Sequence, residues 1–489
     1  MRSLLLKYRK LPVQVKASIW FAISAVVVKG ITVITTPVFT RLMTPGEYGQ
    51  FNIFTSWQSI LTIFVSLNLY CGVYTQGLVK FEERRGEFIS ALHGLTLTLV
   101  FIWLAIYLCF QNFWNHLFSL TTIQMLAMLS MIWSIAVYGF WSVDERVRCK
   151  YKTLVSVTIV SSFLRVGVGI AAVFYSHDKV TARILSLAGI DLLCYGLLFV
   201  FHVHHSGKFY SGEFWRYALL FNLPLIPHYL SQSVLSVSDR IMIGKMVGES
   251  EAGIYSLAYS LSLLMNLVST AMLQTIEPWI YKKIKANEFY KLSGVAYPAF
   301  VIIALCNLCL IAVAPEIIAI FAPPQYHSAK WIVPCVSMST FFSFAYVFFA
   351  AFEFYYEKTK FIALSTIIGA ILNIILNYIF IPIFGYMAAA YTTLICYFIY
   401  AISHYVFMIQ ICHGRNISGE VYHLPTLLRI VGLFFVLGMA FLLSYHCNWA
   451  RGCLIVSLLV LLFLYKEKLF GAIREIIILR NGNSMSQVK

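Results

Sequence analysis

Charged residues are scarce in this chain of 489 residues. Asp, Glu, Lys and Arg make up 11% of the sequence and hydrophobic residues make up 60%, whereas an ordinary soluble protein carries about 25% charged residues. Acidic side chains are the rarest, with 20 Asp and Glu against 36 Lys and Arg. This composition excludes an ordinary soluble protein and indicates a chain that crosses a membrane many times.

Several sequence signatures of soluble enzymes are also missing. No connection between apolar segments is long enough to hold a soluble domain, and no G-x-x-x-x-G-K-[ST] loop is present for a built-in ATPase. Most of the 11 cysteines lie within apolar segments, where they behave as small hydrophobic residues rather than as a disulfide framework or a metal site. We therefore expect no catalytic site, no metal and no cofactor, and any transport would draw its energy from a gradient.

Fourteen apolar segments are each expected to form a membrane-spanning helix, which needs about 20 residues. The sequence therefore predicts an all-α polytopic membrane protein. The segments span 17–39, 50–72, 89–110, 122–142, 153–175, 183–203, 217–237, 253–276, 292–314, 331–352, 361–381, 386–409, 426–445 and 452–465.

The two halves of the chain repeat each other. The sequence at 47–51 is echoed at 251–255, and the Lys-rich stretch at 150–153 is echoed at 358–361 before another apolar segment. Parallel repeats of this kind recur in secondary transporters, with the substrate path between the halves. We predict a lobe of six helices at 1–210, a second at 211–412, and two further helices with a cytoplasmic amphipathic tail at 413–489.

The positive charges favour one orientation. Of the 36 Lys and Arg residues, 26 lie in loops on the same side as the N-terminus and seven lie on the other side. Cytoplasmic loops carry such an excess, so both termini are predicted to be cytoplasmic. The net charge of +16 then reports orientation, and no nucleic-acid partner is expected.

Three charges lie at one predicted depth near the middle of the membrane, where a charge is costly and often functional. Lys29 and Arg165 are the cations and Asp191 is the acid. The net positive centre suits a doubly anionic ligand, and Asp191 is the candidate for ion coupling. Alternatively, Arg165 and Asp191 neutralise each other as a structural pair. Asp239 and Glu353 lie near predicted helix ends and are expected to be interfacial.

Neutral polar residues are the candidates in the second half. Asn373 and Asn377 share a helix face, so they could hydrogen-bond sugar hydroxyls or hold helices together. His228 is a further candidate for substrate binding. Pro224 and Pro227 interrupt the seventh segment and predict a bend that could act as a hinge.

Four stretches of the chain lie in loops and at the ends of predicted helices: TPVFTRLMTPGEYG at 36–49, SDRIMIG at 238–244, AGIY at 252–255 and FGYMAAA at 384–390. Together they resemble the Wzx-type O-antigen and polysaccharide flippases of the multidrug/oligosaccharidyl-lipid/polysaccharide exporter superfamily. The resemblance implies two six-helix lobes around a central cavity, plus two further helices. It also implies translocation of undecaprenyl-diphosphate-linked oligosaccharide from the cytoplasmic to the periplasmic face of a bacterial inner membrane.

The resemblance transfers no ligand residue, so the candidate residues depend on the depth argument. A cationic centre suits a lipid diphosphate, and the expected partners are this lipid-linked oligosaccharide, membrane lipid, a polysaccharide polymerase and a chain-length regulator. A multidrug or toxic-compound exporter is the first alternative, although its cationic substrates would favour an acidic centre. A polysaccharide polymerase or ligase is the second, although a large periplasmic loop would then be expected. A scaffold role would leave the intramembrane charges without a purpose.

Overall fold

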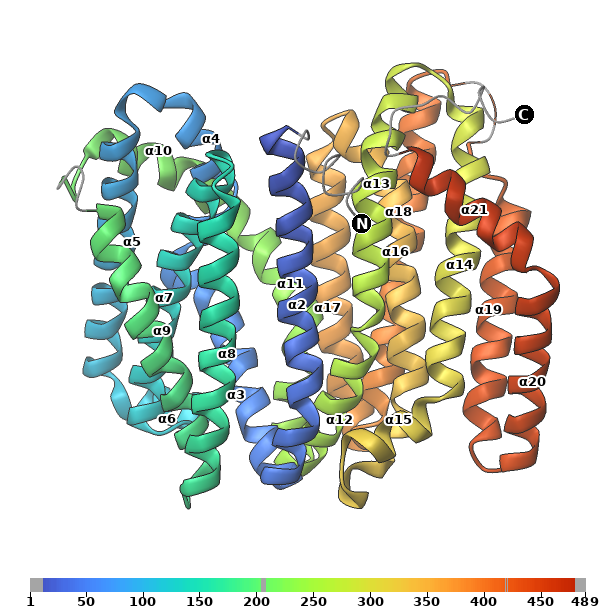
Figure 1. The fold of residues 1–489 in the computed structure, drawn as a ribbon, viewed down its shortest axis with the longest axis horizontal. Helices are drawn as coiled ribbons and strands as arrows, with labels where there is room; N and C mark the ends of the chain where they lie inside the picture. The colour runs from blue at the N-terminus through green and yellow to red at the C-terminus, as the bar shows by residue number, and fades with distance from the viewer. Residues whose placement is uncertain (1–11, 204–207, 418, 420, 480–489) are drawn as a thin grey trace, which may run out of the picture. The chain divides into compact units, whose positions relative to one another are not determined.

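The described residues of the computed structural model are 12–203, 208–417, 419 and 421–479, and within them every regular element is a helix (Figure 1). The basic N-terminal residues before 12 and the tail beyond 479 lie outside this part. The first half contains α2 (Val13–Leu42), α3 (Pro45–Ser66), α4 (Val73–Lys80), η1 (Glu82–Arg84), α5 (Arg85–Cys109), α6 (Gln111–Phe118), α7 (Thr122–Val147), α8 (Tyr151–Tyr175), α9 (Lys179–Val203), α10 (Gly212–Asn222), η2 (Leu223–Leu225) and α11 (Ile226–Met246). The second half contains α12 (Glu249–Ser262), α13 (Met265–Lys285), η3 (Phe289–Lys291), α14 (Leu292–Ala312), α15 (Ala314–Phe321), η4 (Pro324–Trp331), α16 (Val333–Tyr355), α17 (Thr359–Phe384), α18 (Ala388–Gly414), α19 (Leu424–Ser444), α20 (Asn448–Leu464) and α21 (Lys466–Leu479).

Eleven helices of the described chain are long and apolar enough to cross a membrane. The other three expected segments coincide with α3, with the broken pair α10 and α11, and with α20, which has 17 residues. The all-α polytopic fold is confirmed, whereas the exact number of spans stays a prediction.

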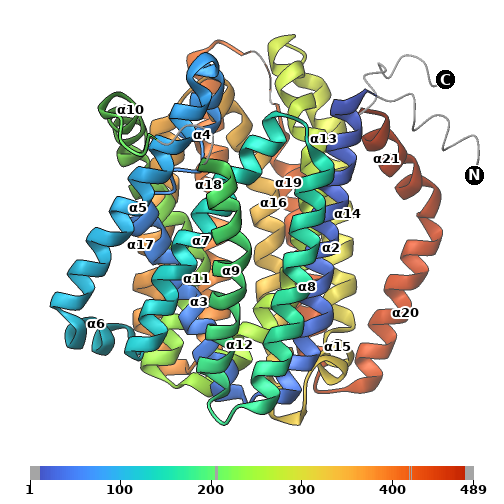
Figure 2. The ribbon, with the colours of Figure 1, turned by 60° about the vertical axis from the view of Figure 1, so that its left-hand side comes forward.

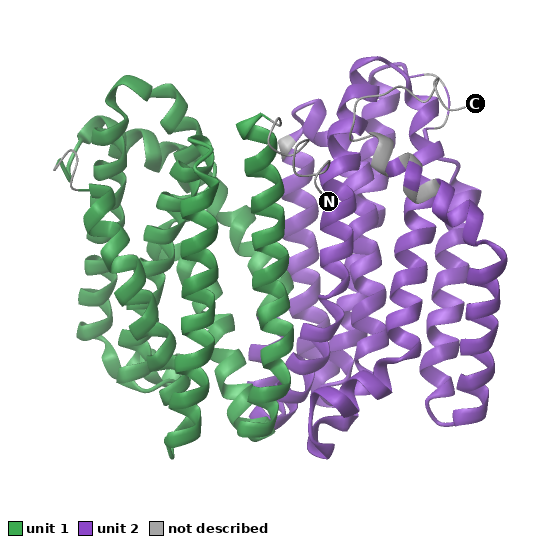
Figure 3. Cartoon of the chain, viewed as in Figure 1, with its two compact units in different colours: residues 1–237 green, residues 238–489 purple. Residues whose placement is uncertain are grey.

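Two compact units make up the chain, residues 1–237 and 238–489 (Figure 3). Within the first unit, α7 packs against α3, α5 and α9, and α9 also packs against α8. Within the second, α16 packs against α12, α14 and α18, and α18 also packs against α17. The helices therefore pair in the same order in both units. The predicted boundaries of the two six-helix lobes, at 210 and 412, stay a prediction.

The turns after α7 and α16 share a backbone hydrogen bond and a left-handed residue at the same position. In the turn 145–150, the amide of the sixth residue donates to the carbonyl of the first over 2.8 Å, and the turn 353–358 contains the same bond at 2.8 Å. The fifth residue of each turn, Cys149 or Glu357, has a φ of 56°. The sequence echo at 150–153 and 358–361 thus reflects a structural repeat.

Three predicted segments are broken, two that we expected to be uninterrupted helices and the proline-containing segment that we expected to bend. The segment 50–72 ends as α3 at Ser66, and Leu67 and Asn68 have φ of 50° and 49°. Segment 253–276 is divided between α12 and α13, and segment 217–237 is interrupted by η2. A break frees backbone carbonyls, which need new donors in a membrane. Asn222 supplies one such donor, because its amide bonds the carbonyl of Leu67 over 2.8 Å.

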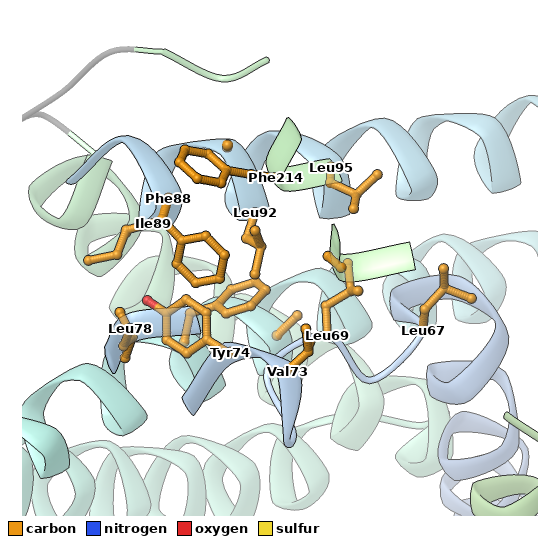
Figure 4. Packing of buried hydrophobic residues seen from close by; sticks show 14 residues of the cluster. Leu67, Leu69, Val73, Tyr74, Leu78, Phe88, Ile89, Leu92, Leu95 and Phe214 are labelled. Carbon is orange, nitrogen blue, oxygen red and sulfur yellow. The ribbon is translucent and has the colours of Figure 1, made fainter. Parts of the chain in front are cut away.

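Aromatic rings fill the core of the first unit where α4, α5 and α10 meet (Figure 4). The ring centroid of Phe88 lies 5.8 Å from that of Tyr74 and 5.4 Å from that of Phe214. Gly77 permits this packing, since a Cβ there would lie 2.1 Å from the Phe88 ring. The short helix α4 is therefore stabilised mainly by the packing of its side chains against α5 and α10.

The polar corner at 40–49 is a structural joint between α2 and α3. Thr44 and Glu47 form a capping box, in which the Thr44 amide donates to Glu47 Oε2 over 2.7 Å. From α9, the Arg183 guanidinium lies 3.7 Å from the ring centroids of both Phe39 and Phe51. This cation–π sandwich fastens the start of α9 to the corner.

Candidate functional site

Arg165 and Asp191 form an ion pair in the first unit. Arg165 Nε on α8 donates to Asp191 Oδ1 on α9 over 2.5 Å. Asp191 is buried, with 2% of its side chain exposed, whereas 32% of the Arg165 side chain is exposed. The two terminal nitrogens of Arg165 make no hydrogen bond to any described residue. The carboxylate is thus satisfied by one nitrogen, and the rest of the guanidinium can bind a further anion.

Two tyrosines support this pair. The Arg165 guanidinium carbon lies 5.3 Å from the ring centroid of Tyr195, and Tyr195 lies 4.8 Å from Tyr138 between centroids. Tyr138 is bonded to Thr158 over 2.7 Å, and Tyr195 donates to Ser161 over 3.4 Å. These contacts join α7, α8 and α9 and hold Arg165 in one orientation.

Lys29 does not join this pair. It lies near the midpoint of α2, its side chain is exposed, and it makes no hydrogen bond or ion pair within the described chain. Of the three charges that we predicted to lie together, Arg165 and Asp191 are in contact, and Lys29 contacts neither of them. The proposed role of Lys29 in substrate binding stays a prediction.

The predicted break around Pro224 and Pro227 is present as η2, which separates α10 from α11. Nearby, His228 is half-buried, and its Nδ1 is buried without a hydrogen-bond partner among the described residues. The break is a structural feature, whereas motion at the prolines and substrate binding by His228 stay predictions.

A buried carboxylate organises the second unit. Asp239 Oδ2 accepts hydrogen bonds from the hydroxyls of Tyr255 and Thr393, each over 2.6 Å, and Asp239 Oδ1 accepts one from the Asn377 amide over 2.6 Å. The side chain is 1% exposed. None of the described basic residues forms an ion pair with Asp239. Its negative charge is stabilised by neutral donors alone.

Asn373 and Asn377 belong to this network. Asn373 Oδ1 accepts from Ser238 over 2.9 Å and from Asn377 over 3.3 Å, and Asn377 Oδ1 accepts from Thr392. Both asparagines are fully buried. Their contacts hold α17 to α11 and α18, which is one of the two alternatives left open by the sequence. Sugar binding by these amides stays a prediction.

Asp239 is 1% exposed and Glu353 is fully buried, so both are covered by neighbouring helices, whereas their expected interfacial depth stays a prediction. The predicted segment ended at 237, whereas α11 continues to Met246 and carries Asp239 well inside the helix. Glu353 does lie near the end of α16, but the helix is covered there by α18.

A second polar cluster lies where α5, α7 and α9 run alongside one another (Figure 2). Asp144 is bonded by Arg85 over 2.6 Å and paired with Arg148 at 3.0 Å, and His202 Nε2 lies 3.6 Å from it. His202 Nδ1 lies 3.0 Å from His93 Nε2. The sequence analysis missed this cluster, because Arg85 and Arg148 were counted only as cytoplasmic loop charges.

No group of three or more His, Cys, Asp and Glu residues within the described ranges could hold a metal ion. Oxygen ligands for a monovalent cation are a different matter. The Asp239 carboxylate has hydroxyl oxygens of Tyr255 and Thr393 within 2.6 Å, and carboxylate and other oxygens are the ligands that hard cations prefer.

The chain matches the models of two known protein families. Residues 15–284 match the model of the family described as "Polysaccharide biosynthesis protein", and residues 224–379 match the model described as MatE. A Haemophilus influenzae protein of the Lsg locus is 23% identical over 381 residues, which cover 73% of this chain and 89% of that protein. The capsular polysaccharide biosynthesis protein CapF of Staphylococcus aureus is 23% identical, and the match covers 76% of this chain and 93% of CapF.

Solved structures share the fold. The lipid II flippase MurJ in an inward closed conformation has a TM-score of 0.69 at 12% identity, over 92% of this chain and 99% of MurJ. An inward-facing MATE-family multidrug resistance transporter of the MOP superfamily has a TM-score of 0.62 at 13% identity, over 81% of this chain and 100% of the transporter. These neighbours are transporters and flippases rather than enzymes. The chain is a multi-pass membrane protein that belongs to the polysaccharide biosynthesis protein family.

Proposed function

We propose that this protein is a flippase for undecaprenyl-diphosphate-linked oligosaccharide repeat units of O-antigen or a related surface polysaccharide. It moves them from the cytoplasmic to the periplasmic face of a bacterial inner membrane by alternating access, with both termini in the cytoplasm. The family match and the fold support lipid-linked saccharide transport. The observation that carries the choice of a diphosphate headgroup is the cationic centre of the first unit.

That centre has more positive than negative charge. Asp191 is bonded through Nε of Arg165, which leaves both terminal nitrogens of Arg165 without a partner among the described residues. Lys29, on α2, is exposed and unpaired within the same described chain. Guanidinium and ammonium groups bind phosphate through short charge-assisted hydrogen bonds. They would lower the cost of moving a diphosphate through hydrocarbon.

We further propose that coupling to an ion gradient uses Asp239 rather than Asp191, the candidate from the sequence. Asp191 already has a cationic partner, Arg165, at 2.5 Å, so its charge is already compensated. Asp239 has three neutral donors. A bound coupling cation would relieve the cost of its buried charge.

A multidrug exporter is the second candidate function. The match of residues 224–379 to the MatE model favours it, as does the buried acidic Asp239 in that range, because acidic sites suit cationic drugs. The cationic first unit is the observation against it. An oligosaccharide polymerase and a chain-length regulator are the partners expected to use the translocated product under the first proposal.

A complementation experiment separates the two functions. The gene is expressed in a strain that lacks its own repeat-unit flippase but still makes lipid-linked oligosaccharides, and surface polysaccharide is measured beside drug resistance. We expect restored polysaccharide with the wild-type chain, loss with Arg165→Ala at equal abundance, and no gain of drug resistance. Drug resistance without any restored polysaccharide, across donors of several repeat units, would overturn the flippase proposal.

A further inference from the structure

Glu353 and His404 form a buried carboxylate–imidazole pair between α16 and α18. His404 Nδ1 lies 2.7 Å from Glu353 Oε1, and both side chains are 0% exposed. The distal atoms of both groups, Glu353 Oε2 and His404 Nε2, are buried without a hydrogen-bond partner within the described residues. Such orphaned polar atoms are rare in native proteins and call for an explanation.

The corresponding place in the first unit is built differently. The repeat of the two turns matches Glu353 with Glu145 at the end of α7, which is also buried with an unbonded Oε2 but has no imidazole bonded to it among the described residues. The cations of the first unit gather on the preceding residue, Asp144, which pairs with Arg85 and Arg148 and lies 3.6 Å from His202 Nε2. The Glu353 carboxylate has only His404 as a hydrogen-bond partner among the described side chains.

Charge counting shows what this pair can bind. A hydrogen bond at 2.7 Å requires one proton between the two heavy atoms. If that proton is the only one, the carboxylate is negative, the imidazole is neutral, and the buried site carries a net charge of −1. A second proton makes the pair electrically neutral. Burial in a medium of low dielectric constant favours the neutral state.

Among the described residues, two tyrosine rings flank the pair. Tyr346 from α16 lies 5.1 Å from His404 between ring centroids, and Tyr400 from α18 lies 4.5 Å from it. A further acid, Glu277 on α13, interacts electrostatically with Tyr346 and accepts a bond from Tyr281 over 3.0 Å. No described Lys or Arg side chain forms an ion pair with Glu353. A proton is therefore the available means of neutralising this site.

We propose that the Glu353–His404 pair is a proton-binding site in the second unit, separate from Asp239. It takes up one proton on the pair and, in that form, holds α16 to α18. Loss of the proton leaves an uncompensated buried carboxylate and weakens the contact between these helices. This inference goes beyond the proposed function and names the ion at this site, whichever ion binds at Asp239.

The test measures proton binding by stability, so that it does not depend on transport. The folded pair holds one proton more than its unfolded residues do at pH 8, so stability is greatest at low pH and is lost as pH rises. We expect Tm of the purified full-length protein in detergent to fall between pH 6.5 and 9. Glu353→Gln keeps the bond from His404 Nδ1 but cannot bind the second proton, so much of that fall should disappear.

Thr340→Val is the matched control in the same unit, because it removes the buried hydrogen bond from Thr340 to Asn307 over 3.1 Å, neither group titrates, and its pH profile should follow the wild type. His404→Gln is the second variant at the site and should also flatten the profile. Equal pH dependence in the wild type, Glu353→Gln and His404→Gln would overturn the proposal. In proteoliposomes, a wild type without flippase activity would refute the proposed function while leaving the Tm result to decide on the proton site.

Discussion

Arg165 and Asn373 occupy the same position in the two halves of the repeat. Each lies 15 residues after the last residue of the repeated turn, which is Lys150 in the first unit and Lys358 in the second. In the first unit this position holds a cation bound to Asp191. In the second it holds an amide bonded to Ser238, beside the buried Asp239. One duplicated scaffold thus carries an Arg–Asp ion pair in one unit and a buried carboxylate with neutral donors in the other, and we propose that the first serves headgroup binding and the second ion coupling.

Lys29 tests the cationic centre without disturbing a known contact. The side chain is exposed and unpaired within the described chain, so Lys29→Ala should leave the fold and abundance unchanged. A hydrogen bond to a charged group contributes about 1.5–3 kcal/mol, and its loss should slow polysaccharide export about 10- to 100-fold. Lys29→Arg should retain most export because it keeps the charge. Normal export by Lys29→Ala at normal abundance would exclude Lys29 as a substrate contact.

Asp239 and Asp191 make different predictions for ion coupling. Asp239→Asn removes the charge that a cation or proton would neutralise, so transport driven by an imposed proton or sodium gradient should fall to the level without a gradient. Asp191→Asn should retain its gradient response, although freeing Arg165 from its partner should alter stability or substrate affinity. The reverse pattern, measured in the same vesicles at matched protein level, would return the coupling role to Asp191.

Gly94 on α5 tests the packing of the first unit. A Cβ at this position would lie 2.0 Å from the backbone oxygen of Phe209, so Gly94→Ala requires the backbone to move. Overpacking of this kind costs about 1–3 kcal/mol, and Tm should fall. The matched control is Gly167 on α8, where nothing lies within 4 Å of an added Cβ. Gly167→Ala should leave Tm unchanged or raise it, and equal effects of the two substitutions would contradict the packing described for α5.

Orientation is tested with fusions. The distribution of Lys and Arg predicts that the helix α6 faces the periplasm and that the end of α13 faces the cytoplasm. Alkaline phosphatase inserted at 111–115 should therefore be active, and the same enzyme fused after Lys283 should be inactive. A fluorescent protein that folds only in the cytoplasm should give the opposite pattern. An active phosphatase after Lys283 would refute the predicted topology.

The helices and one contact of the site were predictable from the sequence. Apolar runs of membrane length predicted α8 and α9, and depth counting put Arg165 and Asp191 at one level, where the structure pairs them. The breaks in the segments 50–72 and 253–276 were not predictable, because hydropathy averages over about 20 residues and does not register the left-handed φ of Leu67. The partners of Asp239 also escaped notice, since Tyr255, Asn377 and Thr393 come together only through the packing of three helices.

The measurement that tests the central claim most directly uses proteoliposomes that contain the purified protein and a defined undecaprenyl-diphosphate oligosaccharide. A membrane-impermeant oxidant reports the fraction of headgroups on the outer face. The account predicts that the wild-type protein makes inner-leaflet headgroups accessible to the oxidant and that Arg165→Ala, at equal reconstitution, leaves only the outer-leaflet fraction accessible. If the wild type leaves the inner-leaflet headgroups protected with and without an imposed gradient, the protein does not translocate this lipid and the account is contradicted.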